Sequence, residues 1–188
     1  MQWIVIGISG ASGVIYGIRL LEWFRSQPDL NYRTRLVMTP SAERNITIET
    51  GFSVSDVRAL ADVCDDYQNL AAPISSGSFP TAGMIVAPCS IRTLSDIAHC
   101  NAHNLLARAA DVTLKERRKL VLVTRETPLH LGHIRLMAQA AEMGAVILPP
   151  MPAFYHKPAK MMDIVDQTVG KILDQFAVPH NLFKRWGE

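Results

Sequence analysis

Residues 4–13 read IVIGISGASG, an apolar stretch that runs directly into a turn of small residues. Residues 14–25 then carry apolar side chains at helical spacing, so the segment predicts a strand, a glycine-rich turn and a helix. Glycines allow backbone N–H groups to approach an anion closely, and the amino end of the helix adds partial positive charge. The segment therefore predicts a site for a phosphate-bearing ligand at a strand–helix junction.

The spacing of this turn argues against two common nucleotide sites. Its glycines follow G-x-x-G-x-x-G rather than the G-x-G-x-x-G of dinucleotide-binding proteins. No acidic residue ends the next apolar stretch, residues 35–39, where it would hold a ribose. No Lys-Ser or Lys-Thr pair follows the turn, so it is not a P-loop.

Strands and helices alternate along the rest of the chain. We expect strands at residues 33–38, 83–87, 120–124 and 145–148, and helices at 41–50, 54–61, 105–117, 130–143 and about 159–176. Residues 65–81 are rich in Ser, Pro, Gly and Asn, which favours a functional loop rather than core. The pattern predicts a single three-layer αβα domain over residues 1–188, with a Rossmann-like or flavodoxin-like parallel sheet. Ligands of such sheets bind at the carboxyl ends of the strands.

Composition limits the classes of function. The 188 residues are 48% hydrophobic and 19% charged, which favours one sizeable core and an oligomer that covers apolar surface. The net charge of +2 is too small to indicate nucleic-acid or membrane binding. Three cysteines without C-x-x-C spacing, together with the lack of a signal peptide or transmembrane stretch, predict a cytoplasmic protein with reduced thiols.

Polar residues follow three of the expected strands, at 10–13, 90–93 and 125–127. Ser90 and Thr93 either cap the next helix or contact a ligand. Arg125 and Glu126 suit a phosphate clamp beside a carboxylate that transfers protons, and the alternative is an ordinary surface ion pair.

Other candidate residues are less specific. Arg108 and Lys115 lie seven apart on one expected helix face, where they either meet a doubly charged phosphate or form part of a solvated surface. His130 and His133 lack a third ligand at suitable spacing, so we expect no metal site. Cys89 is expected to be buried and inert rather than a nucleophile.

The order and spacing of several motifs resemble the UbiX-type flavin prenyltransferases over essentially the whole chain. The matching segments are residues 7–13 (GISGASG), 75–78 (SSGS), 88–93 (PCSIRT), 108–112 (RAADV), 114–118 (LKERR), 125–129 (RETPL), 152–156 (PAFYH) and 185–186 (RW). The resemblance implies an enzyme that joins the dimethylallyl group of dimethylallyl monophosphate to N5 and C6 of reduced FMN without a metal. It also implies a dodecamer with active sites at subunit junctions, which delivers prenylated FMN to a UbiD-type decarboxylase.

The resemblance further implies roles for individual residues. FMN is held by Gly10, Ala11, Ser12, Thr39, Ser90, Ile91, Arg92, Thr93 and Arg125. The prenyl phosphate is held by Ser76, Arg108, Lys115, Arg125, Tyr155 and Lys171, with Glu126 beside it. An aromatic face for the allyl cation comes from the flavin or from a side chain such as Trp186. The catalytic set is Glu49, which assists proton transfer, with Glu126, Ser12, Lys115 and Tyr155.

Three positions depart from the family pattern. Thr39-Pro40-Ser41 stands where many members have Ser-Lys-Ala, so the hydroxyl is kept and the cation is lost. Leu70 stands where some members have Trp, which thins the aromatic lining of the prenyl pocket. Lys171 stands where Arg is frequent, which keeps the charge but not the bidentate fork.

Two other functions stay open at this point. One is an FMN-dependent decarboxylase of a small aromatic acid, and the other is a non-catalytic FMN carrier. The resemblance also leaves open the preference for mono- or diphosphate and the pathway served, either ubiquinone biosynthesis or the decarboxylation of aromatic acids.

Overall fold

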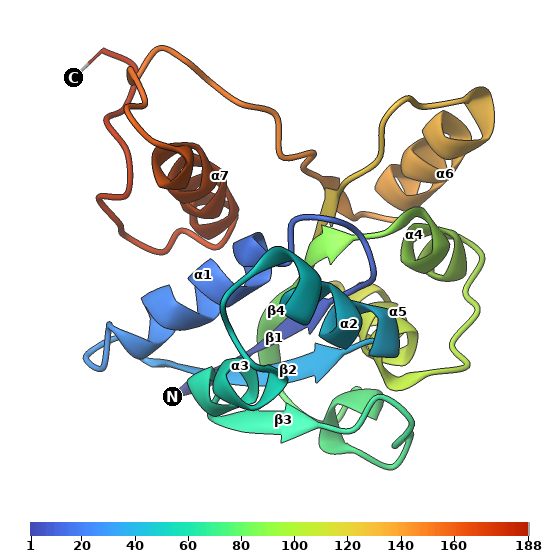
Figure 1. Ribbon diagram of the computed structural model, residues 1–188. Helices are drawn as coiled ribbons and strands as arrows, with labels where there is room; N and C mark the ends of the chain where they lie inside the picture. Colours follow the sequence, from blue (N-terminus) through green and yellow to red (C-terminus); the bar gives the residue numbers. More distant parts are fainter. Residues whose placement is uncertain (188) are drawn as a thin grey trace.

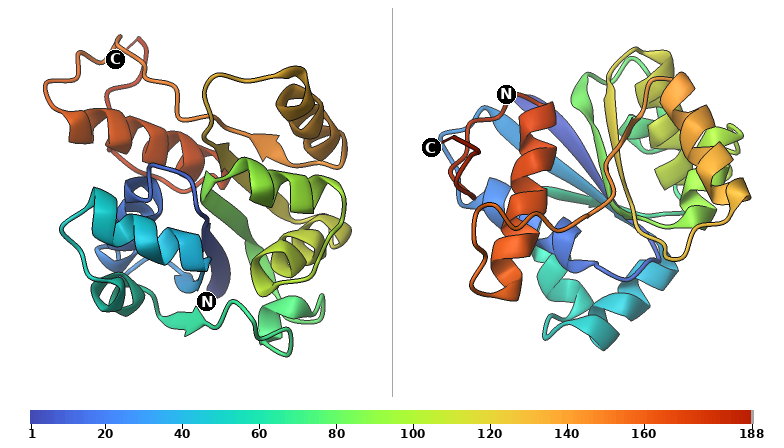
Figure 2. Two further views of the ribbon diagram at one scale, coloured as in Figure 1. Left: turned by 45° about the vertical axis from the view of Figure 1, so that its right-hand side comes forward. Right: turned by 90° about the horizontal axis from the view of Figure 1, so that it is seen from above.

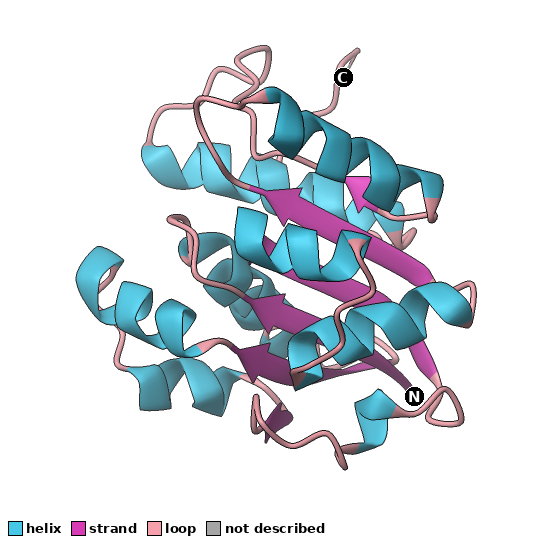
Figure 3. Cartoon of the chain, turned by 90° about the vertical axis from the view of Figure 1, so that its right-hand side faces the viewer, coloured by secondary structure: helices cyan, strands magenta, loops and turns pink. Residues whose placement is uncertain are grey.

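The computed structural model describes residues 1–187, which form one α/β domain around a six-stranded sheet. The strands are β1 (Gln2–Ile8), β2 (Tyr32–Met38), β3 (Val63–Asp65), β4 (Thr81–Cys89), β5 (Lys119–Thr124) and β6 (Val146–Ile147). All neighbouring strands pair in parallel, in the order β3-β2-β1-β4-β5-β6. Figure 3 shows the strands of this sheet in magenta, with helices around them. The chain passes from β1 to β2 on one side of the sheet centre and from β4 to β5 on the other. Because these two connections run in opposite directions, a crevice forms at the carboxyl ends of β1 and β4.

Helices cover both faces of the sheet, which confirms the predicted αβα architecture (Figures 1 and 2). On one face lie α1 (Ile15–Arg25), α2 (Pro40–Glu49), α3 (Val54–Leu60) and α7 (Met161–Gln175). On the other lie α4 (Ile91–Ala98), α5 (Leu105–Lys115) and α6 (Leu131–Glu142), with the short 3₁₀ turn η1 (Pro73–Ser75) beside α5. The carboxyl edge of the sheet stays open between these layers.

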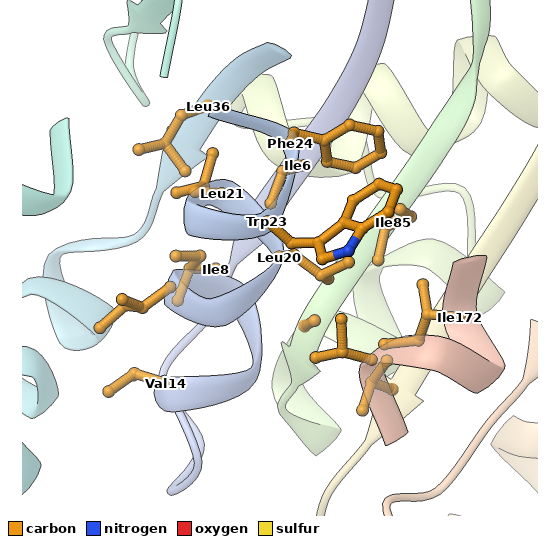
Figure 4. Packing of buried hydrophobic residues seen from close by; sticks show 14 of the residues in the cluster. Ile6, Ile8, Val14, Leu20, Leu21, Trp23, Phe24, Leu36, Ile85 and Ile172 are labelled. Atoms are coloured by element: carbon orange, nitrogen blue, oxygen red, sulfur yellow. The ribbon is translucent and has the colours of Figure 1, made fainter. Parts of the chain in front are cut away.

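The core follows from strand alternation. Ile4, Ile6 and Ile8 face α1, whereas Val5 between them faces α5, and all four are at most 1% exposed. The side chains on the α1 side of the sheet form one hydrophobic cluster, which also contains Trp23 and other large side chains (Figure 4). Full burial of one such side chain contributes about 1.5–3 kcal/mol, so both sheet faces hold their helices firmly.

Residues 65–81 correct one prediction. This stretch contains η1, and the Ala72 and Ile74 side chains are each 3% exposed and pack in the core beside α5. The expectation of a loop outside the core was therefore wrong, because two apolar residues within a polar stretch are enough to anchor it. The strand β3 was not predicted, because a strand of three residues is too short to show the alternation of apolar and polar side chains.

None of the helices within residues 1–187 is both long and apolar enough to span a membrane.

Candidate functional site

Ser9 joins two of the strand ends at which ligands were expected. Its hydroxyl donates to the carbonyl oxygen of Pro88 at 2.9 Å and accepts from the N–H of Ser90 at 2.7 Å. Ser9 is fully buried, so these bonds tie the turn after β1 to the loop after β4. Ser9 was not among the predicted site residues, although a small polar residue directly after an apolar strand is a signal for such a link.

One face of α2 supports the glycine-rich turn. A side chain at Gly10 would bring its Cβ to 2.4 Å from the Cβ of Ser41, so glycine is required there by the close approach of α2. Four residues further along α2, Asn45 donates to the turn at 3.2 Å, and after four more Glu49 accepts from the N–H of Gly13 at 2.8 Å. Gly13 has a φ of +100°, which strongly favours glycine.

These contacts correct part of the anion-binding prediction. The N–H of Gly13 already donates to a carboxylate, and the N–H of Ala11 donates to the carbonyl of Ser9 at 2.9 Å. Two amides of the turn therefore have acceptors inside the chain. The exposed side chain of Ser12 lies at the tip of the same turn.

A cavity of about 370 Å³ lies at the carboxyl edge between α2 and α4. The hydroxyls of Thr39 and Ser90 cap these two helices by accepting from the N–H groups of Ala42 and Thr93, at 3.1 and 3.2 Å. Both amino-terminal helix ends, with their partial positive charge, thus border one cavity. Its lining residues are Gly10, Thr39, Pro40, Ser41, Arg44, Tyr67, Ser90, Arg92, Thr93 and Asp96. Hydroxyls, helix ends and two guanidinium groups fit the phosphate and ribityl chain of a flavin mononucleotide.

A second cavity, of about 360 Å³, lies beside the end of β5 and is lined by Thr124, Arg125, Glu126, Thr127 and the residues 149–152. The N–H of Arg125 donates to the carbonyl of Cys89, which fixes its backbone against β4. Its guanidinium has no ion pair or hydrogen bond within the described part of the chain. Glu126 instead accepts from the N–H of Thr127 at 3.1 Å, so the alternative of an Arg125–Glu126 surface ion pair is wrong.

Tyr16 was not predicted as a site residue, but it lies close to Arg125. Burial raises the pKa of the Tyr16 phenol, and the positive charge of Arg125 acts in the opposite direction. The Tyr16 ring also stands against Gly13, 3.0 Å from the position of a Cβ there. Arg125 is therefore near the glycine-rich turn, although 112 residues separate it from Gly13 in the sequence.

A second group of predicted residues comprises Ser76, Arg108 and Lys115. Arg108 donates to the carbonyl just before Ser76 at 3.1 Å and pairs with Asp111 at 2.7 Å. Lys115 pairs with Glu116 and lowers the pKa of that carboxyl. These residues precede β4 and β5, so Ser76 and Lys115 lie toward the amino edge of the sheet, away from the glycine-rich turn.

A third group comprises Tyr155, Lys171 and Trp186. The Trp186 ring is 82% exposed and meets Tyr155 edge-on, with ring centroids 5.7 Å apart. Both aromatic side chains line a cavity of about 440 Å³. Lys171 pairs with Asp174 at 3.5 Å, and Asp174 also accepts from Arg185 at 2.8 Å, which holds the carboxyl-terminal segment beside α7.

The second and third groups do not meet within one chain. The second lies on and beside α5, whereas the third lies on and beside α7, and these helices cover opposite faces of the sheet (Figures 1 and 2). A site that uses cations from both groups needs more than one copy of the chain.

The remaining candidates lie as follows. Leu70 is 47% exposed in the segment before η1. Cys89 is fully buried, and burial strongly raises the pKa of its thiol, which makes it a poor nucleophile. His130 caps α6 through its Nδ1, and its ring lies against that of His133, with centroids 3.6 Å apart and ring planes tilted by 36°.

Comparison with known proteins places this geometry in context. The Flavoprotein family model matches residues 1–183. The chain is 58% identical over 188 residues to the flavin prenyltransferase UbiX of Escherichia coli K12, which covers 99% of this chain and 98% of that protein. A crystal structure of AnUbiX (PadA1) with FMN and dimethylallyl pyrophosphate has a TM-score of 0.95 and 47% identity, covering 100% and 98% of the two chains. A dodecameric FMN-dependent UbiX-like decarboxylase from E. coli O157:H7 has a TM-score of 0.96 and 46% identity, with full coverage of both.

Proposed function

Because the chain belongs to the family of UbiX flavin prenyltransferases, we propose specific roles for its residues in the prenylation of reduced FMN. The enzyme joins the dimethylallyl group of a dimethylallyl phosphate to FMN and so makes prenylated FMN. The observation that carries this function is the match to the E. coli enzyme along 99% of the chain. The donor-rich carboxyl edge of the sheet supports it independently.

The flavin occupies the carboxyl edge in this proposal. Helix ends capped by Thr39 and Ser90, with the side chains of Arg92 and Thr93, hold its phosphate. The turn that carries Gly10, Ala11 and Ser12, the backbone of Ile91 and the Arg125 guanidinium line the rest of the flavin site.

The prenyl donor is bound beside Arg125 and Glu126. Its C–O bond to the phosphate breaks, the bonding electrons leave with the phosphate, and the allylic carbon forms a bond to N5 of the reduced flavin, which loses its proton. The prenyl double bond then takes up a proton, and its far carbon forms a bond to C6, which loses its own proton. Fixed cations and the Tyr155 phenol stabilise the charge that develops on the departing phosphate. Trp186 or the flavin itself provides an aromatic face for the allyl cation.

Proton transfer is assigned to the two carboxylates of the site, assisted by Ser12. Glu49 is held at the glycine-rich turn by its hydrogen bond from Gly13, so it lies on the flavin side. Glu126 and Arg125 line the same cavity, so we assign Glu126 to the phosphate side.

A complete site requires neighbouring copies. Since the α5 group of Ser76, Arg108 and Lys115 and the α7 group of Tyr155, Lys171 and Trp186 lie on opposite faces, we assign them to different protomers at one junction. The related E. coli O157:H7 protein is dodecameric, and we propose the same assembly here.

The product passes to a UbiD-type decarboxylase in this proposal. The chain acts in the cytoplasm, where its three free cysteines stay reduced.

Anaerobic incubation with reduced FMN and dimethylallyl monophosphate tests the function. Mass spectrometry is expected to find FMN with one added C₅H₈ unit, and parallel incubation with the diphosphate measures the preference between donors. Absence of this product with either donor overturns the proposal. Release of CO₂ from an aromatic acid with no partner protein present would instead support the decarboxylase alternative, the activity after which the related E. coli O157:H7 protein is named.

A further inference from the structure

Thr124 has a buried hydroxyl without a partner in the part of the chain that the structure describes. It is the last residue of β5 and is 2% exposed, and its Oγ1 has no hydrogen-bond partner among residues 1–187. Other buried threonines behave differently: Thr113 donates to the carbonyl of Ala109 at 2.7 Å, and Thr168 donates to that of Ile164 at 3.3 Å. Buried polar groups without partners are rare because they lose their hydrogen bonds to water.

The position of Thr124 explains what could satisfy it. Thr124 pairs with Cys89 at the carboxyl edge, and it lines the same 360 Å³ cavity as Arg125 and Glu126. By strand alternation Thr124 shares its face of β5 with Leu120 and Leu122, which are buried apolar side chains of the cluster beside α5. Valine has the same shape as threonine, so packing alone does not require a hydroxyl at this position.

We propose that the Thr124 hydroxyl donates a hydrogen bond to an oxygen atom of the phosphate-bearing ligand that Arg125 binds. The guanidinium and the hydroxyl together offer N–H and O–H donors, which suit the oxygens of an anion. The inference rests on the proposed function, because both FMN and the prenyl donor carry a phosphate.

Three variants of the full-length protein test this inference. Thr124→Val keeps the shape and removes the hydroxyl, Thr124→Ser keeps the hydroxyl, and Thr168→Val removes a buried hydroxyl on α7 that already has a partner. Affinities for FMN, dimethylallyl monophosphate and inorganic phosphate are measured separately by calorimetry, together with the melting temperature of the ligand-free protein.

The Thr124→Val protein is expected to melt no lower than wild type and to bind FMN or the prenyl phosphate about three- to tenfold more weakly. A loss limited to FMN places the hydroxyl on the flavin, and a loss limited to the prenyl phosphate places it on the donor. Thr124→Ser and Thr168→Val are expected to bind all ligands as wild type does.

Unchanged affinities in Thr124→Val overturn the inference, and so does an equal loss in Thr124→Ser. The wild-type assay separates this result from the proposed function. If wild type binds the ligands but makes no prenylated FMN, the function fails while the comparison of variants still decides the role of Thr124. If wild type binds none of them, both fail.

Discussion

At the scale of single residues, the cations proposed to hold the prenyl phosphate differ in whether they pair with a carboxylate of their own chain. Arg108, Lys115 and Lys171 each pair with a carboxylate of their own chain, whereas the Arg125 guanidinium has no such partner within residues 1–187. Exposed pairs of this kind contribute only about 0–1 kcal/mol, so a doubly charged phosphate can replace the carboxylate at little cost. Arg125 needs no such exchange, which fits the phosphate-binding role proposed for it.

Glu126→Gln separates catalysis from storage of the flavin. The substitution removes a carboxylate that can move a proton but keeps its shape, so product formation is expected to fall about 10²–10⁴-fold, the usual contribution of general acid–base catalysis. FMN affinity, followed by quenching of flavin fluorescence, is expected to change little. The exposed Glu142→Gln on α6 serves as the control. Full product formation by Glu126→Gln would contradict the proton-transfer role assigned to Glu126.

At the scale of elements, contacts between α2 and the glycine-rich turn position the candidate flavin site. Ser41, Asn45 and Glu49 are spaced by four and so lie on one face of α2. Ser41 packs against the turn at Gly10, Asn45 donates a hydrogen bond to it, and Glu49 accepts one from its amide at Gly13. The turn is therefore a rigid wall whose shape depends on α2.

Gly10→Ala tests this dependence. The new Cβ would lie 2.4 Å from that of Ser41, so α2 must shift, and we expect a loss of about 1–3 kcal/mol in the free energy of unfolding. Adding Ser41→Gly removes the obstructing atom, and urea denaturation is expected to show that the double variant recovers part of this loss. Additive effects of the two substitutions would contradict the contact.

Asp174 links the carboxyl-terminal segment to α7 in a pH-dependent way. Hydrogen bonds from Arg185, followed by His180, lower the pKa of this carboxyl from its ordinary 3.8 to about 2. Because the pKa is lower in the folded state, the stabilisation is complete above about pH 4 and disappears as the pH falls toward 2. Trp186 fluorescence is expected to report release from Tyr155 over that range. Asp174→Asn is expected to show the released signal already at neutral pH, and a wild-type-like signal would contradict the link.

At the scale of the whole molecule, the residues proposed for one site lie on different surfaces of the domain. The carboxyl edge carries the residues proposed to bind the flavin, and the two faces carry the α5 and α7 groups. A closed symmetric assembly can bring one surface of each kind together at every junction.

Subunit complementation tests this arrangement. Lys115→Ala and Lys171→Ala are each expected to be inactive when assembled alone. When equal amounts of the two variants are co-assembled, about a quarter of the junctions receive both wild-type lysines, because Lys115 and Lys171 of one junction come from different protomers. Two affinity tags allow mixed oligomers to be purified, and prenylated FMN is measured. Co-assembly of Lys115→Ala with Arg108→Ala is the control and is expected to stay inactive, since both residues come from one protomer. No recovery in the first mixture would contradict the assignment.

Local patterns in the sequence were enough to predict the alternating elements, the parallel αβα sheet and the strand ends that carry Gly10, Ser90 and Arg125, because strand periodicity and turn chemistry are properties of neighbouring residues. Only the folded chain revealed that Ser9 joins two loops and that Glu49 accepts from an amide of the glycine-rich turn. It also revealed that the Thr124 hydroxyl lacks a partner among residues 1–187 and that the predicted cations divide between two faces. These features depend on contacts between residues that lie far apart in the chain, and no local pattern records which side chains such contacts bring together or keep apart.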